Sequence, residues 1–184
     1  MNRGAIRTTV VVLVFEGCLA SSCSDLGNEE AQQSGIASDS ALFDYIGRKD
    51  PFTSYPLFPN VDSVASGTLN GSSAHQPLVR VRLNAKAVSA LHGGSLPSGT
   101  GFPDGSVILK EIIMQGKTVL YAVIVKDNAN PFSAGGWLWG EYRTDGTPLF
   151  SLLLKGSGCV SCHSREQGLL HDLVRTFERQ RPTE

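Results

Sequence analysis

Two cysteines followed directly by a histidine, in the order Cys159-Val160-Ser161-Cys162-His163, lie close to the end of this 184-residue chain. Two thiols three positions apart at the start of a helix can each add to one vinyl group of the same porphyrin, and the following histidine can then ligate the iron. The motif therefore predicts covalent haem c. Cys159 and Cys162 would attach the porphyrin, and His163 would be the proximal iron ligand.

The same cysteine pair could also be a redox-active dithiol or part of a zinc site. A redox-active dithiol would follow a strand in a parallel α/β context, whereas the glycine-containing segment 155–158 precedes this pair. A zinc site would need two further ligands, and the chain has no second Cys-x-x-Cys pair and no paired-histidine motif. Haem attachment is therefore the preferred interpretation.

The first residues of the chain have the pattern of an export signal. Arg3 and Arg7 precede a short apolar run at residues 8–15, which is well below the ~18 residues that a membrane-spanning helix needs. We therefore predict a signal peptide over residues 1–23 and a protein exported to the periplasm. Glu16 interrupts the apolar stretch, so a cytosolic protein with an apolar N-terminus stays as the alternative.

Cys23 is a candidate site for a lipid anchor. The segment Ala20-Ser21-Ser22-Cys23 resembles a bacterial lipobox, although Leu19 lies one position further from the cysteine than the usual aliphatic residue. The polar residues that follow cannot bury enough surface to fold, so we predict a flexible tether over residues 24–40. Residues 41–184 would form the haem domain. Acylation of Cys23 and plain secretion both stay open.

The balanced charge of the chain argues against a nucleic-acid partner. The chain has 16 Lys+Arg against 17 Asp+Glu and a formal net charge of -1. Nucleic-acid binders usually carry a strong basic excess, so we predict no nucleic-acid partner. Apolar residues make up 41% of the chain, which is enough for the core of one domain, and frequent Gly and Pro favour short elements joined by turns.

The hydrophobic periodicity predicts an α+β fold, a single domain dominated by an antiparallel β-sheet with flanking helices. Two β-branched runs joined by a short loop containing Gly116 indicate a hairpin, whose second strand is apolar on both faces and therefore central. Strands are expected at residues 78–83, 107–114, 118–126 and 136–142, after one or two N-terminal helices. A helix over 85–91 would be capped by Asn84. An amphipathic C-terminal helix would span 169–177 and end before Pro182.

Lys110 is the second unusual residue. Period-2 alternation places it on the same strand face as Ile108, Ile112 and Met114. Burying a lysine among such residues is costly unless its amine is paired, neutral or chemically used. The alternative is an edge-strand lysine whose stem covers apolar surface while its amine reaches water.

The order of these motifs resembles the cytochrome P-460 family. The resemblance rests on residues 101–111, Gly-Phe-Pro-Asp-Gly-Ser-Val-Ile-Leu-Lys-Glu, followed by a strand-rich segment and a late Cys-x-x-Cys-His, and it covers about residues 78–177. It implies a mostly β-sheet haem protein, periplasmic and usually a homodimer. Lys110 matches the lysine that is bonded to the porphyrin in the branch that oxidises hydroxylamine. A sister branch, the cytochromes c'-beta, lacks that bond and binds gases in a hydrophobic distal pocket.

A distal carboxylate would be needed to accept protons from hydroxylamine during its oxidation. The segment 152–158 just before the haem motif contains no acidic residue. Glu141 and Asp145 are the nearest candidates, and Glu141 could equally be a solvated strand residue. The sequence therefore leaves open whether the protein is an enzyme.

The other side of the iron is predicted to be open. Met114 is expected in the core, and His75 and His92 at the surface. His171 lies eight positions after His163 and would point away from the same helix face. We therefore predict an open distal site that faces Phe102 or other apolar groups.

The predicted function is a periplasmic c-type haem protein that binds or oxidises small nitrogen species, hydroxylamine or nitric oxide, at an open haem. Its partners would be this small molecule and an unidentified redox partner. Two alternatives are kept: an electron-transfer c-type cytochrome with two protein ligands to the iron, and a non-catalytic gas-binding protein of the c'-beta kind.

Overall fold

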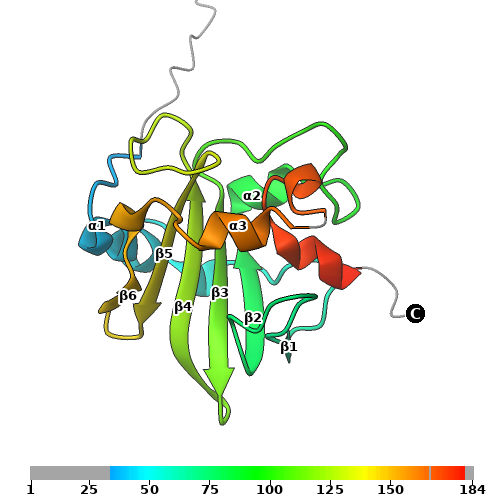
Figure 1. Ribbon diagram of the computed structural model, residues 1–184, viewed down its shortest axis with the longest axis horizontal. Helices are drawn as coiled ribbons and strands as arrows, with labels where there is room; N and C mark the ends of the chain where they lie inside the picture. The colour runs from blue at the N-terminus through cyan, green and yellow to red at the C-terminus, as the bar shows by residue number, and fades with distance from the viewer. Residues whose placement is uncertain (1–33, 166, 181–184) are drawn as a thin grey trace, which may run out of the picture. The chain divides into compact units, whose positions relative to one another are not determined.

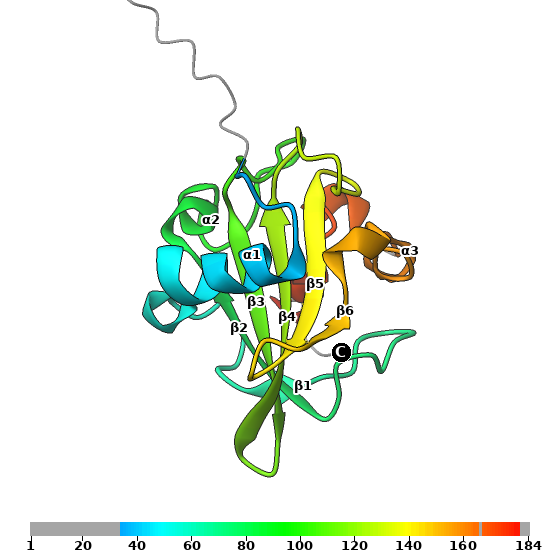
Figure 2. The ribbon, with the colours of Figure 1, turned by 90° about the vertical axis from the view of Figure 1, so that its left-hand side faces the viewer.

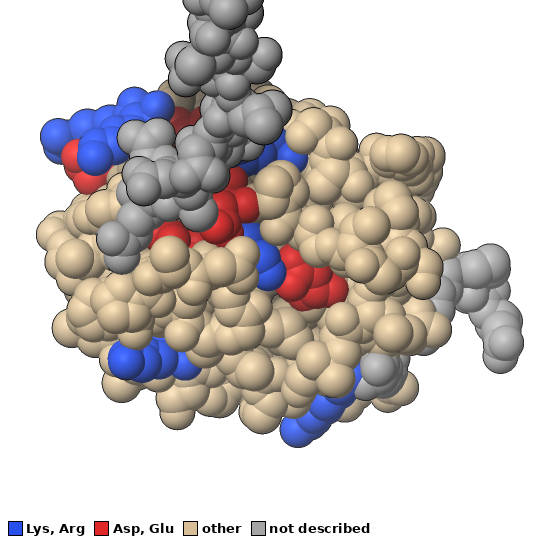
Figure 3. Space-filling view, turned by 90° about the horizontal axis from the view of Figure 1, so that it is seen from above, with Lys and Arg blue, Asp and Glu red and all other residues tan. Residues whose placement is uncertain are grey.

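A computed structural model of the protein describes residues 34–165 and 167–180. The predicted signal peptide, the acylation of Cys23 and most of the predicted tether lie outside these residues. Within the described ranges, no helix is long and apolar enough to cross a membrane. On the face shown in Figure 3, the described residues expose mainly uncharged side chains, with acidic groups near the centre and separated basic groups.

The centre of the fold is a six-stranded antiparallel sheet whose strands follow one another in chain order (Figure 1). Its strands are β1 (Ala65–Ser66), β2 (Leu78–Leu83), β3 (Val107–Met114), β4 (Lys117–Lys126), β5 (Trp137–Arg143) and β6 (Pro148–Phe150). This confirms the predicted sheet-dominated α+β domain. The central position predicted for the second strand of the hairpin is also confirmed, because β4 lies between β3 and β5. The short strands β1 and β6 had no signal in the periodicity.

The β3–β4 hairpin closes through two residues with left-handed backbones. Gln115 has φ 50 and Gly116 has φ 75, the combination that a type I′ turn requires. A shift of register between Ile112 and Ile113 turns the end of β3. Met114 is consequently 50% exposed rather than part of the core, so the expectation that it shares the buried face of Lys110 is wrong.

Both faces of the sheet are covered, which explains why its central strands are apolar on both sides. One face, here called the site face, carries Ile108, Ile124 and Trp139 and packs against the C-terminal segment, including Phe177. The opposite face carries alternate residues such as Leu109 and packs against the N-terminal helices. Figure 2 shows α1 (Asp39–Asp44) and α3 (Cys159–His163) on opposite sides of the sheet.

The N-terminal elements confirm the expected helices before the first strand. After α1 come the π-helical turn η1 (Tyr45–Lys49) and the 3₁₀ turn η2 (Phe52–Ser54). Residues 34–40, assigned to the tether from the sequence, pack on the domain: Ile36 is buried, and the backbone N–H and hydroxyl of Ser34 both donate to Asp127. The Asp39 carboxylate accepts hydrogen bonds from the Tyr142 and Ser151 hydroxyls. These contacts fix α1 against the opposite face.

The helix after β2 forms as predicted but is shorter. It is α2 (Ala85–Ser89), and the Asn84 side chain caps it by accepting a hydrogen bond from the Ala87 N–H. The remaining short elements precede and follow the haem motif: η3 (Leu152–Leu154), η4 (Leu169–His171) and η5 (Arg175–Gln180).

The predicted continuous helix over residues 169–177 is wrong. Two 3₁₀ segments, η4 and η5, are separated by residues 172–174, of which Asp172 and Leu173 have left-handed backbones (φ 51 and 66). The Asp172 carboxylate accepts hydrogen bonds from Lys126 Nζ and the Phe102 N–H, which hold it outside a helical path. Leu173 then turns into the core, while Leu169 stays 70% exposed.

Candidate haem site

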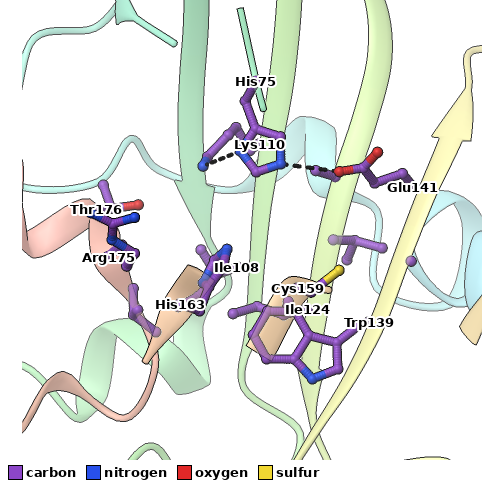
Figure 4. Close-up of a pocket in the computed structure, with 14 residues that line it drawn as sticks. His75, Ile108, Lys110, Ile124, Trp139, Glu141, Cys159, His163, Arg175 and Thr176 are labelled. Carbon is purple, nitrogen blue, oxygen red and sulfur yellow. Dashed lines mark hydrogen bonds and ion pairs between the residues drawn. The ribbon is translucent and has the colours of Figure 1, made fainter. Parts of the chain in front are cut away.

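A crevice opens on the site face between the sheet, α3 and the start of η5 (Figure 4). Three of its polar residues, His75, Lys110 and Glu141, lie together at one end, which is called the polar end, while Arg175 and Thr176 lie apart from them. An overlapping pocket, which adds Cys162, Leu69 and Phe150, shares the polar end with it. The lining includes His75, Ile108, Lys110, Ala122, Ile124, Trp139, Glu141, Cys159, His163, Val174 and Arg175.

Strand register places the polar groups of the sheet in one row. Lys110 pairs with Ala122 across β3–β4, and Ala122 pairs with Glu141 across β4–β5. The three residues therefore lie side by side on the site face. Because Ala122 is small, the lysine and the glutamate flank an open space. In the next row Ile124 and Trp139 fill the corresponding positions.

A glycine lets the haem motif approach the sheet. Gly156 has φ 64, and a Cβ at this position would lie 2.6 Å from the Trp139 ring. Only glycine permits this close passage of the chain over the indole. The short helix α3 begins three residues later and brings the His163 ring to 4.8 Å from the Trp139 ring, edge to face.

His163 is prepared to bind a metal through one nitrogen. Its Nδ1–H donates to the Leu173 carbonyl oxygen, with 2.7 Å between the two heavy atoms. Burial, together with the charge of Lys110, lowers the pKa of His163 to about 3, so the imidazole is neutral. With Nδ1 protonated and occupied, Nε2 keeps a lone pair that could bind a metal ion. A backbone carbonyl that orients a ligating histidine in this way is a common second contact around metals.

The two thiols of the motif differ in their surroundings. Both cysteines are free and partly buried. Burial raises the pKa of Cys159 to about 11. Burial would also raise the pKa of Cys162, but hydrogen bonds from Ser72 and Arg175 lower it below the usual value. Arg175 Nη1 lies 3.2 Å from the Cys162 sulfur.

A chain of hydrogen bonds joins the polar groups of the crevice. Lys110 Nζ lies 2.9 Å from His75 Nδ1, and His75 Nε2 lies 3.0 Å from Glu141 Oε1 (Figure 4). Lys110 is only 8% exposed and belongs to an interior strand, so the alternative of an edge-strand lysine that reaches water is wrong. Burial, and then the positive charge of Arg179, lower the pKa of Lys110 to about 8.

The structure brings together most of the residues predicted from sequence. Lys110, Glu141, Cys159 and His163 line the crevice, and Cys162 lines the overlapping pocket. The other candidate acid, Asp145, lies exposed between β5 and β6. Glu141 is therefore the candidate carboxylate that shares the site with the haem motif.

Phe102 lies in the core instead of the crevice lining. It is 3% exposed and packs against Trp137 and Phe177, with ring centres 5.7 and 6.3 Å apart. Its contact with a haem stays a prediction. Among the other histidines, His92 is exposed as expected, and His171 packs on Phe177.

His75 is the site residue that the sequence analysis missed. It was expected at the surface, but its side chain is only 16% exposed and lies within the crevice. It belongs to the long connection between β1 and β2, which has no periodicity. Only the fold of this connection over the site face brings the imidazole to Lys110, so no local sequence signal identifies it.

The residues of the crevice suit a haem better than a bare metal ion. Within the described residues, no cluster of three or more His, Cys, Asp or Glu side chains could hold a bare metal ion. Iron inside a porphyrin needs only an axial ligand such as His163. The buried Arg179 Nε and Nη2 have no hydrogen-bond partner among the described residues, and the charge of Arg179 lowers the pKa of the crevice residue Lys110. A carboxylate near them, such as a haem propionate, would compensate this costly arrangement. With the apolar lining, these groups fit the cofactor.

A Cys-x-x-Cys-His motif beside an apolar crevice is typical of c-type haem proteins. The comparison with family models is more specific: the model described as Cytochrome P460 matches residues 62–175. This is more than half of the chain, so the protein belongs to the cytochrome P460 family, as the motif order indicated. No curated protein matches the chain significantly.

Proposed function

We propose that the protein carries haem c, which Cys159 and Cys162 would attach and His163 would ligate, and that it oxidises hydroxylamine in the crevice. The observation that carries the proposal is the chain of hydrogen bonds from Lys110 through His75 to Glu141. It supports a polar reaction site in the crevice that His163 also lines. When bound, the haem supplies the iron that takes up electrons from the substrate.

Glu141 would accept the protons that hydroxylamine loses on oxidation. Its side chain is 30% exposed, so it connects the crevice with water and can release protons there. A carboxylate in hydrogen-bond reach of a substrate is an ordinary general base. The sequence left open which carboxylate could act in this way, and the position of Glu141 in the crevice supports its assignment to that role.

Lys110 is the residue proposed to bond to the porphyrin. Its nitrogen would replace a hydrogen of the macrocycle, and the two electrons and two protons released would pass to an added oxidant of the peroxide class and to water. Its amine faces the crevice, and the lowered pKa makes the neutral, nucleophilic form accessible near pH 8. With such a bond, the ferrous absorption spectrum should lie to the red of an ordinary c-type haem. The haem peptide from a complete digest should also carry the Lys110 segment. A digest without that segment would contradict the bond.

Gas binding without catalysis is the second candidate function. It is favoured by the apolar inner lining, which includes Ile108, Ile124 and Val174. Such a lining suits nitric oxide or carbon monoxide. In either case the proposal includes a periplasmic location, because c-type haem is attached outside the cytoplasm. Anchoring through Cys23, a homodimer and a separate redox partner are further parts of the proposal.

Replacing Glu141 by Gln tests the proposed reaction. The amide keeps the shape of the side chain but cannot accept a proton at neutral pH. We expect hydroxylamine oxidation, measured with an artificial electron acceptor, to fall about 10²–10⁴-fold, the usual contribution of a general base. Asp145→Asn, which removes an exposed carboxylate, is the matched control and should change little. A Glu141→Gln protein with full activity would leave gas binding as the better description.

A further inference from the structure

His75 occupies a position in the crevice that its surroundings define closely. The ring lies between Lys110 Nζ at 2.9 Å and Glu141 Oε1 at 3.0 Å. Its centre is 6.5 Å from the centre of the His163 ring, at an interplanar angle of 65°. Figure 4 shows His75 between the lysine and the glutamate, with His163 separate from this group.

The two hydrogen bonds have a fixed direction. A lysine ammonium only donates, and a carboxylate only accepts. Nδ1 of His75 therefore accepts from Lys110, and Nε2–H donates to Glu141. One neutral tautomer satisfies both contacts at once, and burial of the ring favours that neutral form by lowering the pKa of His75.

Lys110 and Glu141 both depend on His75 for their side-chain hydrogen bonds. Among the described residues, His75 is the sole side-chain hydrogen-bond partner of Lys110 and of Glu141. The two are separated on the sheet by Ala122, whose methyl group makes no polar contact. Without the imidazole, a buried amine and a carboxylate would each sample several rotamers over this gap. Their placement therefore depends on a residue from a distant loop.

We propose that His75 is a positioning residue, which holds the Lys110 amine and the Glu141 carboxylate in one arrangement beside the ligand-binding side of the haem. A small molecule at that position meets a hydrogen-bond donor and an acceptor whose places are set in advance. The proposal requires a haem in the crevice. If Lys110 is also bonded to the porphyrin, its remaining N–H still donates to His75, and the Glu141 carboxylate is then the group that His75 positions. The proposal does not depend on which small molecule reacts there.

Two substitutions separate this role from general packing. His75→Leu fills similar space and removes both hydrogen bonds. His75→Gln keeps an acceptor oxygen and a donor N–H, so it can bridge the same two groups. His92→Leu, at an exposed histidine, is the matched control. Haem content and thermal melting of each holoprotein establish that the variants fold.

Carbon monoxide bound to the ferrous protein is the probe. Its C–O stretching band reports the polar groups near the ligand, and its dissociation rate reports their hydrogen bonds. We expect one narrow band for the unmodified protein and a shifted or split band for His75→Leu. Dissociation should become about tenfold faster, the size of one hydrogen bond to a charged group. His75→Gln should restore both properties, and His92→Leu should not alter them.

Two outcomes would overturn the proposal. An unchanged band and rate in His75→Leu would reduce His75 to a packing role. If the unmodified haem resists carbon monoxide and is low-spin, and both His75 variants bind the gas, His75 itself ligates the iron. Neither readout uses hydroxylamine, so a protein that fails to oxidise it can still pass this test.

Discussion

Lys110 and Glu111 are neighbours on β3, and they show how differently the two faces of the sheet treat a buried charge. Glu111, on the opposite face, is 7% exposed and contacts Arg82 at 3.0 Å and Arg80 at 3.4 Å. Lys110, on the site face, is 8% exposed and its hydrogen bond goes to the neutral ring of His75. The glutamate has its countercharges and is structural. Among residues 34–165 and 167–180, no countercharge contacts the lysine directly, an arrangement typical of functional sites.

The largest effect is expected from the haem motif itself. Replacing Cys159 and Cys162 together by Ala removes both sulfurs that would form thioethers, so haem retention after acidic organic extraction should fall to zero. The unmodified protein, produced with a working maturation system, should keep its haem under the same treatment. Complete extraction from the unmodified protein would show that the haem is not covalently held.

A free Lys110 amine should cost stability at neutral pH. Its pKa falls from 10.5 in the unfolded chain to about 8 in the folded protein, so the unfolded state binds more protons between these values. Stability therefore rises with pH across this window, by at most about 3 kcal/mol. Lys110→Leu removes the penalty and should be about 1–3 kcal/mol more stable at pH 7 in urea unfolding.

The informative quantity is the difference in the free energy of unfolding between Lys110→Leu and the unmodified protein, here called the gap. It should narrow as the pH rises from 8 to about 10.5, because the lysine loses its charge in the folded state first. A lysine bonded to the porphyrin carries no ammonium group, so a gap independent of pH would indicate the bond. The red-shifted ferrous spectrum would then revert in Lys110→Leu.

The sequence predicted the parts of this molecule that depend on local pattern. The strands β2 to β5, the Asn84 cap and the haem motif follow from alternation, capping chemistry and spacing. What it missed depends on contacts between distant segments. Asp172 leaves a helical path because Lys126 and the Phe102 backbone bind its carboxylate, and His75 enters the crevice because its loop folds over the sheet.

The strand register also lay beyond the sequence pattern. Alternation placed Lys110 on an apolar face, and it also allowed Glu141 to be a solvated strand residue. Only the pairing of β3, β4 and β5 puts both residues on either side of Ala122. A one-residue slip of β5 would turn Glu141 to the opposite face. The proposed carboxylate could therefore be named from sequence but not distinguished from a surface residue.

The smallest effect is expected on the opposite face. Glu111→Gln keeps the shape of the side chain but removes the charge that Arg80 and Arg82 share. Both arginines are partly exposed, so water compensates in part, and we expect a loss of about 1 kcal/mol in the free energy of unfolding. The absorption spectrum and carbon monoxide binding should not change, because the sheet separates Glu111 from the crevice.

Asp44→Asn provides the control for that substitution. Asp44 pairs with Arg48 at 3.1 Å, but their side chains are 44% and 82% exposed, and exposed pairs contribute little to stability. A Glu111→Gln protein as stable as Asp44→Asn would show that burial of the glutamate does not strengthen its pairs. A changed haem spectrum in Glu111→Gln would contradict the comparison itself. Charge on the opposite face would then influence the site face, and Glu111 could no longer be called structural in contrast to a functional Lys110.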